Sequence, residues 1–169
     1  MKERKKDRWW LLPILAMAAA IVVNLFILVN AYVPSGSMEP TLPTGALMIG
    51  DRTAFLRGDP RTGDVVLFRK EAEFGRKVLV KRVVALPGQT FSMESGRVYI
   101  DGRLLEEEYI AEFSLDHYPE TVVPEGCYVV LGDHRTGSND SRFWEDPFVH
   151  REDLLARALF TYFPRPSLL

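Results

Sequence analysis

An uncharged segment of 24 residues, 9–32, constrains this chain more than any other feature. It is long enough to cross a bilayer as a helix, and it begins and ends with aromatic residues that suit the headgroup level. Residues 1–8 before it carry a net charge of +3, and the positive-inside rule places such a cluster in the cytoplasm. The sequence therefore predicts a basic cytoplasmic segment (1–8), one N-terminal transmembrane helix as an anchor (9–32) and an extracytoplasmic domain (33–169).

Two alternatives compete with the anchor. A cleavable signal peptide would also have a basic start, and Ala16-Met17-Ala18 resembles a small-x-small cleavage site. However, the apolar core of a signal peptide is normally about 7–15 residues long, and this run continues through Leu28. A buried core helix does not fit an apolar segment of this length without a polar face. We read Pro13, Asn24 and Asn30 as a tolerated kink and polar contacts, and we favour an uncleaved anchor.

The composition fits one modest globular domain behind this segment. The chain has 169 residues, of which 47% are hydrophobic, and that suits a single domain. Residues 33–169 carry a net charge of −5, whereas nucleic-acid binding needs a basic patch, so we expect no nucleic-acid partner. The single cysteine, Cys127, excludes an intrachain disulfide and a cysteine-based metal cluster.

Short apolar runs separated by turn residues predict a mainly β domain with an antiparallel sheet. Asp101-Gly102 is typical of a hairpin turn, and it lies in a small excursion from the sheet that we expect over residues 89–125. We interpret Leu154-Leu155 as a short turn of helix. The expected strands and hairpin cover residues 64–68, 77–85, 97–105, 127–131 and 156–163.

A serine and a lysine stand in settings that suit hydrolytic chemistry. Ser35 and Ser37 lie on a Pro/Gly turn, and a serine hydroxyl becomes a good nucleophile only when a base removes its proton. Lys81 lies in an apolar strand, where burial would disfavour its charged form and so allow it to act as that base. Each setting also has an ordinary explanation: Pro, Gly and Ser cluster in turns, and a lysine on an edge strand guards against aggregation.

A dense polar loop follows the apolar run that ends at Leu131. Residues 132–142 contain several hydroxyls and an Asp140/Arg142 pair. Such a loop can hold a charge pair that fixes its shape while a hydroxyl orients a neighbouring amine. The alternative is a solvated loop with a surface ion pair, which would contribute little to stability.

Taken together and in this order, the three segments resemble the bacterial type I signal peptidases, which are membrane-anchored serine proteases with a Ser/Lys dyad. The matching segments are residues 35–42 around the serines, 81–88 around the lysine and 132–142 in the polar loop. The uncharged segment in front of them also fits this family. The resemblance covers nearly the whole chain, and each segment matches over several residues, so the combination is more specific than any one motif.

The resemblance implies a role for each matched residue. Ser37 is expected to be the nucleophile and Lys81 its general base. The Ser35 hydroxyl and the Ser37 backbone N–H are expected to form the oxyanion hole, in which each such donor lowers the barrier by ~3 kcal/mol. Ser138 is expected to orient the lysine amine. Structural support behind the site is expected from Asp133, Asp140 and Arg142.

The resemblance also implies a β-rich catalytic fold that needs no metal and no other cofactor. The expected partners are the signal peptides of exported preproteins, membrane lipid and the secretion machinery. Cleavage would occur at the outer surface of the cytoplasmic membrane, after small residues at positions −1 and −3 of the preprotein.

The polar loop departs from the family pattern in two places. His134 stands where the family usually has asparagine, and Thr136-Gly137 before Ser138 is less usual. We do not assign His134 to a Ser–His triad, because the matching position in the family is structural. Two other functions remain open: a self-cleaving protease with the same Ser/Lys dyad, and an inactive membrane-tethered scaffold for exported proteins.

Overall fold

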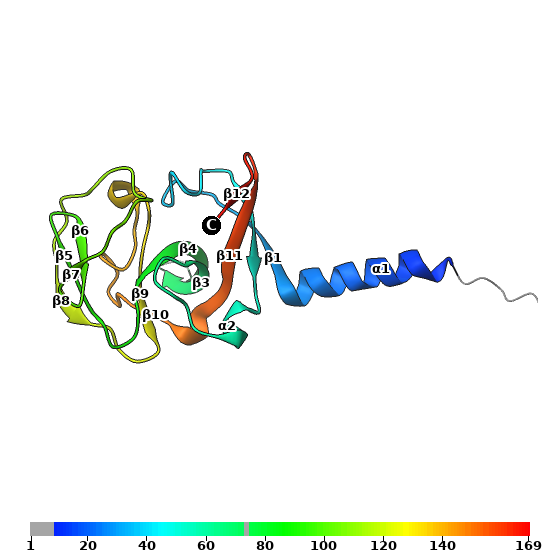
Figure 1. The fold of residues 1–169 in the computed structure, drawn as a ribbon, viewed down its shortest axis with the longest axis horizontal. Coiled ribbons are helices and arrows are strands. Elements are labelled where there is room, and N and C mark those ends of the chain that lie inside the picture. Colours follow the sequence, from blue (N-terminus) through cyan, green and yellow to red (C-terminus); the bar gives the residue numbers. More distant parts are fainter. Residues whose placement is uncertain (1–8, 73–74) are drawn as a thin grey trace, which may run out of the picture.

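The computed structural model describes residues 9–72 and 75–169, so the predicted cytoplasmic segment 1–8 lies outside the described residues. The chain enters through α1 (Leu11–Val22), which continues as a π-helical stretch (Val23–Ile27) and passes directly into strand β1 (Leu28–Tyr32). In Figure 1 this helix projects away from a body built of strands.

Two antiparallel sheets make up that body in the described residues. The larger has eight strands in the order β1-β2-β11-β3-β4-β9-β10, with β12 added to β11, and the smaller has four in the order β7-β6-β5-β8. Their bounds are β2 Leu47–Asp51, β3 Val65–Ala72, β4 Gly75–Ala85, β5 Thr90–Glu94, β6 Arg97–Ile100, β7 Arg103–Leu104, β8 Tyr118–Val122, β9 Cys127–Leu131, β10 Val149–His150, β11 Leu154–Phe163 and β12 Ser167–Leu168; a short helix, α2, spans Ala54–Arg57. The mainly β, antiparallel fold is therefore confirmed.

The uncharged segment differs from the expected single helix at its C-terminal end. Residues 28–32 form strand β1, which pairs antiparallel with β2 from Leu28 opposite Asp51 to Tyr32 opposite Leu47. The backbone groups of these five residues that face β2 thus bond to a neighbouring strand, and the count of apolar residues does not reveal such pairing. Within the described residues, no helix is both long and apolar enough to cross a membrane.

A second correction concerns Leu154 and Leu155, which we expected in a turn of helix. They begin the long strand β11, and the helical turn lies just before them, at Arg151–Asp153. Leu154 pairs with Phe68 on β3, and its side chain packs beside the core cluster that contains Phe68. Pairing within the sheet therefore overrides a local helical preference.

The expected excursion is the smaller sheet. The hairpin of β5 and β6 and the strand β8 lie within residues 90–122, and they pack through Phe91, Met93 and Val98 against residues of β9. In Figure 1 this sheet lies at the opposite end of the body from α1. The larger sheet and the loops at its edge therefore carry the candidate catalytic residues.

Candidate active site

The nucleophile segment is pinned by its own apolar residues. Met38, directly after Ser37, is 1% exposed, and Leu42 is fully buried; both belong to the core cluster beneath the sheet. The turn between them is closed by the Leu42 N–H, which donates to the Met38 carbonyl at 2.8 Å, and the turn just before it by the Glu39 N–H, which donates to the Gly36 carbonyl at 3.0 Å. The Glu39 carboxylate in turn accepts from Thr44 N–H and Oγ1. Burial of Met38 thus holds Ser37 at the surface of the core in one orientation.

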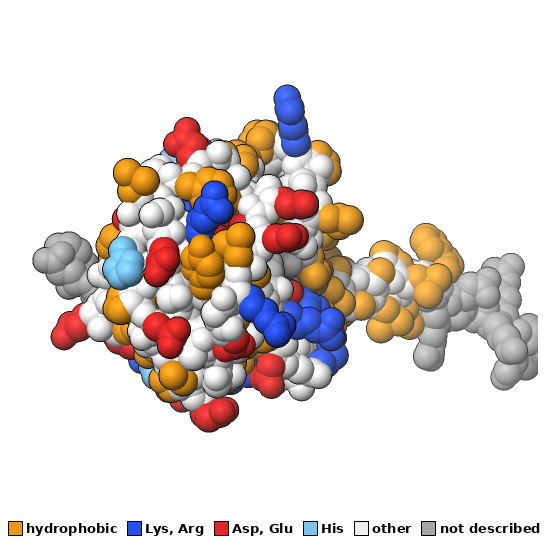
Figure 2. Space-filling model, turned by 60° about the vertical axis from the view of Figure 1, so that its left-hand side comes forward, with side chains coloured by type: hydrophobic (Ala, Val, Ile, Leu, Met, Phe, Trp, Pro, Cys, Tyr) orange, Lys and Arg blue, Asp and Glu red, His pale blue; other side chains and the backbone are white. Residues whose placement is uncertain are grey.

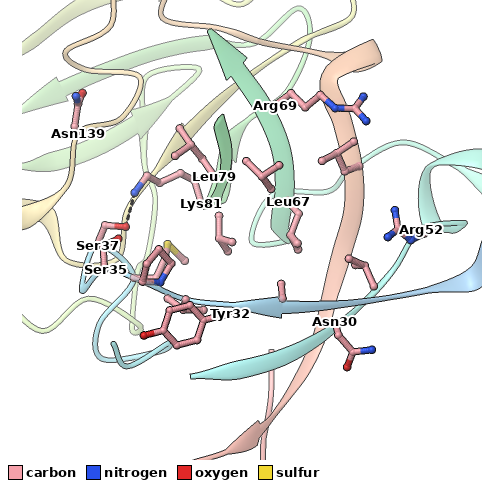
Figure 3. Close-up of a pocket in the computed structure, with 18 of the residues that line it drawn as sticks. Asn30, Tyr32, Ser35, Ser37, Arg52, Leu67, Arg69, Leu79, Lys81 and Asn139 are labelled. Atoms are coloured by element: carbon pink, nitrogen blue, oxygen red, sulfur yellow. Dashed lines mark hydrogen bonds between the residues drawn. The ribbon is translucent and has the colours of Figure 1, made fainter. Parts of the chain in front are cut away.

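Lys81 reaches Ser37 from strand β4. The lysine pairs with Val66 on β3, is 3% exposed, and its Nζ donates to Ser37 Oγ at 2.6 Å (Figure 3). Burial lowers the pKa of the amine from 10.5 to about 8; the carboxylates of Asp140 and Asp133 oppose this shift, and the Arg142 guanidinium adds to it. A lysine with this pKa has a substantial neutral fraction near neutral pH and can accept a proton from the serine.

A mostly apolar cavity of about 760 Å³ opens beside this pair. It runs from Ser37 and Lys81 between β1 and β4 toward two arginines at its far end, Arg52 and Arg69, and Ser35 lies at its wall near Ser37 (Figure 3). The other lining residues are Val29, Asn30, Ala31, Tyr32, Val33, Pro34, Met38, Leu67, Val78, Leu79, Val80, Gly137, Asn139 and Leu155. Ser37 and Lys81 therefore lie at one end of a groove that is lined mainly by apolar side chains.

The polar loop packs against the back of the nucleophile segment. Asp140 is fully buried; it accepts from the Gly132 backbone N–H at 2.9 Å and from Arg142 Nε at 2.8 Å. Arg142 NH2 donates to the Arg135 carbonyl, so this ion pair ties both ends of the loop together. The space at Gly132 is very tight: a Cβ there would lie 2.4 Å from the Ser37 carbonyl oxygen. Glycine is therefore required where the loop passes the nucleophile.

Comparison with known proteins agrees with this geometry. The family model described as "Signal peptidase, peptidase S26" matches residues 6–163. The chain belongs to this signal peptidase family. Members of this family are serine endopeptidases. A relative named "Probable signal peptidase I-2" from Synechocystis is 35% identical over 175 residues, covering 99% of this chain and 79% of the relative.

Two further relatives widen the comparison. A crystal structure of a signal peptidase I from Enterococcus faecalis V583 is 28% identical, with a TM-score of 0.48, over 59% of this chain and 96% of that one. A protein named "Inactive signal peptidase IA" from Staphylococcus aureus is 27% identical over 95% of this chain and 94% of that protein. Since one relative is named inactive, membership of the family does not by itself show that this chain is active.

Ser138 differs from its expected arrangement. Its hydroxyl is buried but has no hydrogen-bond partner among the described residues, so it does not bond to Lys81 in this structure. It lies next to the nucleophile segment all the same, because a Cβ at Gly132 would lie 2.2 Å from Ser138 Oγ and 2.4 Å from the Ser37 carbonyl oxygen. A buried hydroxyl without a partner is unfavourable, and this one is the single such side-chain atom in the described part of this signal peptidase.

Asp133 belongs to a network that the sequence did not reveal. Its carboxylate accepts from Arg82 Nε at 2.9 Å, from Arg82 NH2 at 2.6 Å and from Thr41 Oγ1 at 2.5 Å. The ring of Tyr109 stacks on the Arg82 guanidinium at 3.9 Å. Because Thr41, Arg82 and Asp133 come from the three matched segments, this network joins all three behind the catalytic pair. The sequence did offer one sign of this network: Arg82 lies in an apolar strand, and a buried arginine needs a carboxylate partner.

The excursion contributes a second unforeseen ion pair. Arg135 in the polar loop and Glu107 in the excursion have side chains that are 0% and 2% exposed. Arg135 NH1 donates to Glu107 Oε2 at 3.0 Å, and its Nε donates to the Gly132 carbonyl at 3.0 Å. In residues 9–72 and 75–169 of this signal peptidase, no three side chains of His, Cys, Asp and Glu group as metal ligands.

Proposed function

We propose that this protein removes signal peptides from exported preproteins, with Ser37 as the nucleophile and Lys81 as its general base. The observation that carries the proposal is the 2.6 Å contact between Lys81 Nζ and Ser37 Oγ, made by a lysine whose pKa burial lowers to about 8. The proposed reaction needs a serine and a lysine in contact, and this chain has both, which favours an active enzyme over the scaffold.

The proposed reaction has two stages that use the same base. Neutral Lys81 takes the proton from Ser37 as Oγ attacks the scissile carbonyl, and the lysine then gives that proton to the leaving amine as the C–N bond breaks. Water then attacks the resulting ester and gives a proton to Lys81. Lys81 returns that proton to Ser37 Oγ as the C–Oγ bond breaks, which releases the signal peptide and restores the starting pair. The Ser37 N–H and the Ser35 hydroxyl are proposed to stabilise the oxyanion.

We propose a supporting role for Ser138 and the charged residues behind the site. Ser138 Oγ, which lacks a partner while buried, is proposed to accept from or donate to the lysine amine as the substrate displaces water. Asp133, Asp140 and Arg142 are proposed to fix the polar loop through the bonds described above. None of these three side chains is proposed to exchange protons with the substrate.

The substrate is proposed to bind as an added strand. In the described residues, β9 pairs only with the Arg82–Ala85 part of β4, so the edge from Gly75 to Lys81 has no strand on that side. This edge lines the cavity through Val78, Leu79 and Val80. An extended peptide can pair with such an edge through its backbone while small apolar side chains enter the groove.

The N-terminal segment is proposed to hold the enzyme in the cytoplasmic membrane, with residues 1–8 inside and the catalytic domain outside. No residue of α1 is buried against the rest of the protein, and hydrophobic side chains cover it where it projects (Figure 2). Leu12, for example, is 68% exposed. A helix that is apolar all round needs an apolar environment, and anchorage beside the translocated signal peptide would raise its effective concentration. Membrane lipid and the secretion machinery are the partners implied.

The decisive experiment uses the full chain in detergent and a preprotein with small residues at −1 and −3. We expect cleavage directly after the −1 residue in the wild type, and a loss of at least roughly 10³-fold in both Ser37→Ala and Lys81→Ala. Mass spectrometry of the products locates the cut. A folded wild type that binds preproteins but cleaves none would favour the scaffold, and cleavage confined to its own chain would favour the self-cleaving protease.

A further inference from the structure

The two departures from the family pattern in the polar loop meet behind the nucleophile. The His134 backbone N–H donates to the Ser37 carbonyl at 3.2 Å, and the His134 ring nitrogen Nδ1 lies 3.2 Å from the Gly36 carbonyl oxygen. Because a carbonyl oxygen can only accept, Nδ1 must carry the proton in this contact. One residue thus holds two successive carbonyls of the nucleophile segment.

We propose that His134 is a positioning residue that aims the Ser37 N–H into the oxyanion hole, and that its ring is the reason residue 137 is glycine. The inference rests on the proposed function. The Gly36 carbonyl and the Ser37 N–H belong to one planar peptide unit and point in opposite directions. A donor that fixes the carbonyl oxygen therefore also fixes the direction of the N–H.

The Gly36 carbonyl is held from two sides, which makes its direction well defined. It accepts from the Glu39 N–H at 3.0 Å within the turn and from His134 Nδ1 across the loop. The hydrogen bond from the Glu39 N–H lies within the nucleophile segment itself, whereas the hydrogen bond from His134 Nδ1 comes from the polar loop. His134 is therefore the group that ties this peptide plane to the rest of the site.

The constraint on residue 137 comes from the same ring. A Cβ on Gly137 would lie 2.7 Å from both Nδ1 and Cε1 of His134, closer than real Cβ contacts allow. Gly137 is not among the glycines with positive φ, so its backbone conformation alone would accept other residues. A larger residue at 137 must push the ring away from the Gly36 carbonyl, and the histidine and the glycine thus depend on each other.

His134 does not act as the catalytic base in this arrangement. Its Nδ1 is engaged with the Gly36 carbonyl, while the Ser37 hydroxyl contacts Lys81. Asparagine, the residue usual in the family, can replace the imidazole in this task, because its Nδ2 is the same number of bonds from Cβ as Nδ1 of histidine. This equivalence provides the conservative variant for the test.

The activity test compares His134→Ala and His134→Asn in the full-length enzyme with the preprotein substrate. We expect His134→Ala to lower kcat about 10- to 100-fold with little change in KM, since the oxyanion donor is misdirected while the binding groove is intact. We expect His134→Asn to retain kcat within roughly threefold. His117→Ala, at an exposed histidine, is the matched control and should leave kcat unchanged. Equal kcat in wild type and His134→Ala, or equal losses in the Ala and Asn variants, would overturn the positioning role.

A double-mutant cycle tests the dependence between the two residues. Gly137→Ala should lower both kcat and the thermal unfolding midpoint in the wild-type background, and should lower neither further in the His134→Ala background. Additive effects of the two substitutions would overturn the coupling. The thermal unfolding midpoints test the coupling of His134 and Gly137 even if the wild type cleaves no preprotein. A wild type without cleavage would count against the proposed function alone.

Discussion

Lys81 is held where its ordinary charged form is unfavourable. Burial is the largest influence on its amine, and it outweighs the attraction of Asp140 and Asp133. The same burial brings Nζ to 2.6 Å from the Ser37 hydroxyl. The burial that favours the neutral amine therefore also places it beside the serine.

The pKa of Lys81 predicts the pH dependence of the reaction. Since the neutral amine is the proposed active form and its pKa is lowered to about 8, kcat should rise about tenfold per pH unit below pH 8 and level off above it. A pH–rate profile from pH 6 to 10 measures this. A profile that is flat from pH 6 to 9 would contradict a lysine base.

The same burial predicts a gain in stability when the lysine is replaced. The folded-state pKa of about 8 lies below the ordinary 10.5, so the folded protein binds its proton less readily than the unfolded chain. The penalty is complete below pH 8 and disappears as the pH rises from 8 to 10.5. Lys81→Met should therefore raise the free energy of unfolding at pH 7 by up to about 3 kcal/mol.

Denaturant unfolding at pH 7 and pH 10 checks this difference, which should shrink at the higher pH. Lys77→Met is a suitable control because Lys77 lies exposed on the same strand, β4. A Lys81→Met variant that is less stable than the wild type at pH 7 would show that the lysine is held charged by its neighbours.

At the scale of elements, the excursion is joined to the site loop by the buried pair of Glu107 and Arg135. Removing one partner of such a pair leaves an uncompensated charge in the interior. We expect Glu107→Ala to lower the free energy of unfolding by about 3–5 kcal/mol and to reduce cleavage, because Arg135 also holds the Gly132 carbonyl. Glu108→Ala, at an exposed neighbour, should change neither quantity.

Chemical denaturation and cleavage of the preprotein test this link. The double variant Glu107→Ala/Arg135→Met should recover part of the lost stability, since it removes the unpaired charge. If Glu107→Ala unfolds like the wild type, the excursion is an independent unit and the pair contributes nothing to the loop.

Local patterns predicted the central strands of this fold well. The expected strand 127–131 coincides with β9, and 77–85 covers most of β4. Both are apolar runs that end at glycine or proline signals, so local composition decides them. Residues 28–32 and Leu154-Leu155 were misassigned because their conformation depends on pairing with β2 and β3, which local composition does not contain.

The proposed catalytic pair, Ser37 and Lys81, could be picked out for a different reason. Ser37 and Lys81 each lie in a short motif that can be recognised in the sequence. Asp133, in contrast, bonds to Arg82, 51 positions away, and to Thr41, 92 positions away. Such long-range partners follow from the folded topology alone. The same holds for Ser138, whose expected bond to the lysine is absent here although its place in the site is close to that expected.

At the scale of the whole molecule, the helix and the catalytic body share a short junction. Deleting residues 1–27 would leave β1 paired with β2, whereas deleting residues 1–32 would remove that strand and expose the edge of β2. We expect the 28–169 chain to remain folded and to cleave short peptides, but to lose about 10²-fold in rate on membrane-inserted preprotein.

The 33–169 chain should unfold at a lower temperature and cleave both substrates poorly, because the cavity loses the wall that β1 provides. Thermal unfolding and parallel assays on peptide and vesicle-borne preprotein distinguish the two deletions. Equal stability of both would mean that β1 is dispensable for the sheet.

Strand β1 follows the helical segment without an intervening loop. Its residues Val29–Tyr32 line the cavity that is proposed to bind the substrate. With α1 placed in a bilayer as proposed, a change in helix tilt is transmitted directly to the side chains that contact the substrate. Helices adjust their tilt to the thickness of the hydrocarbon layer. On this proposal we expect lipid acyl-chain length to change substrate selectivity.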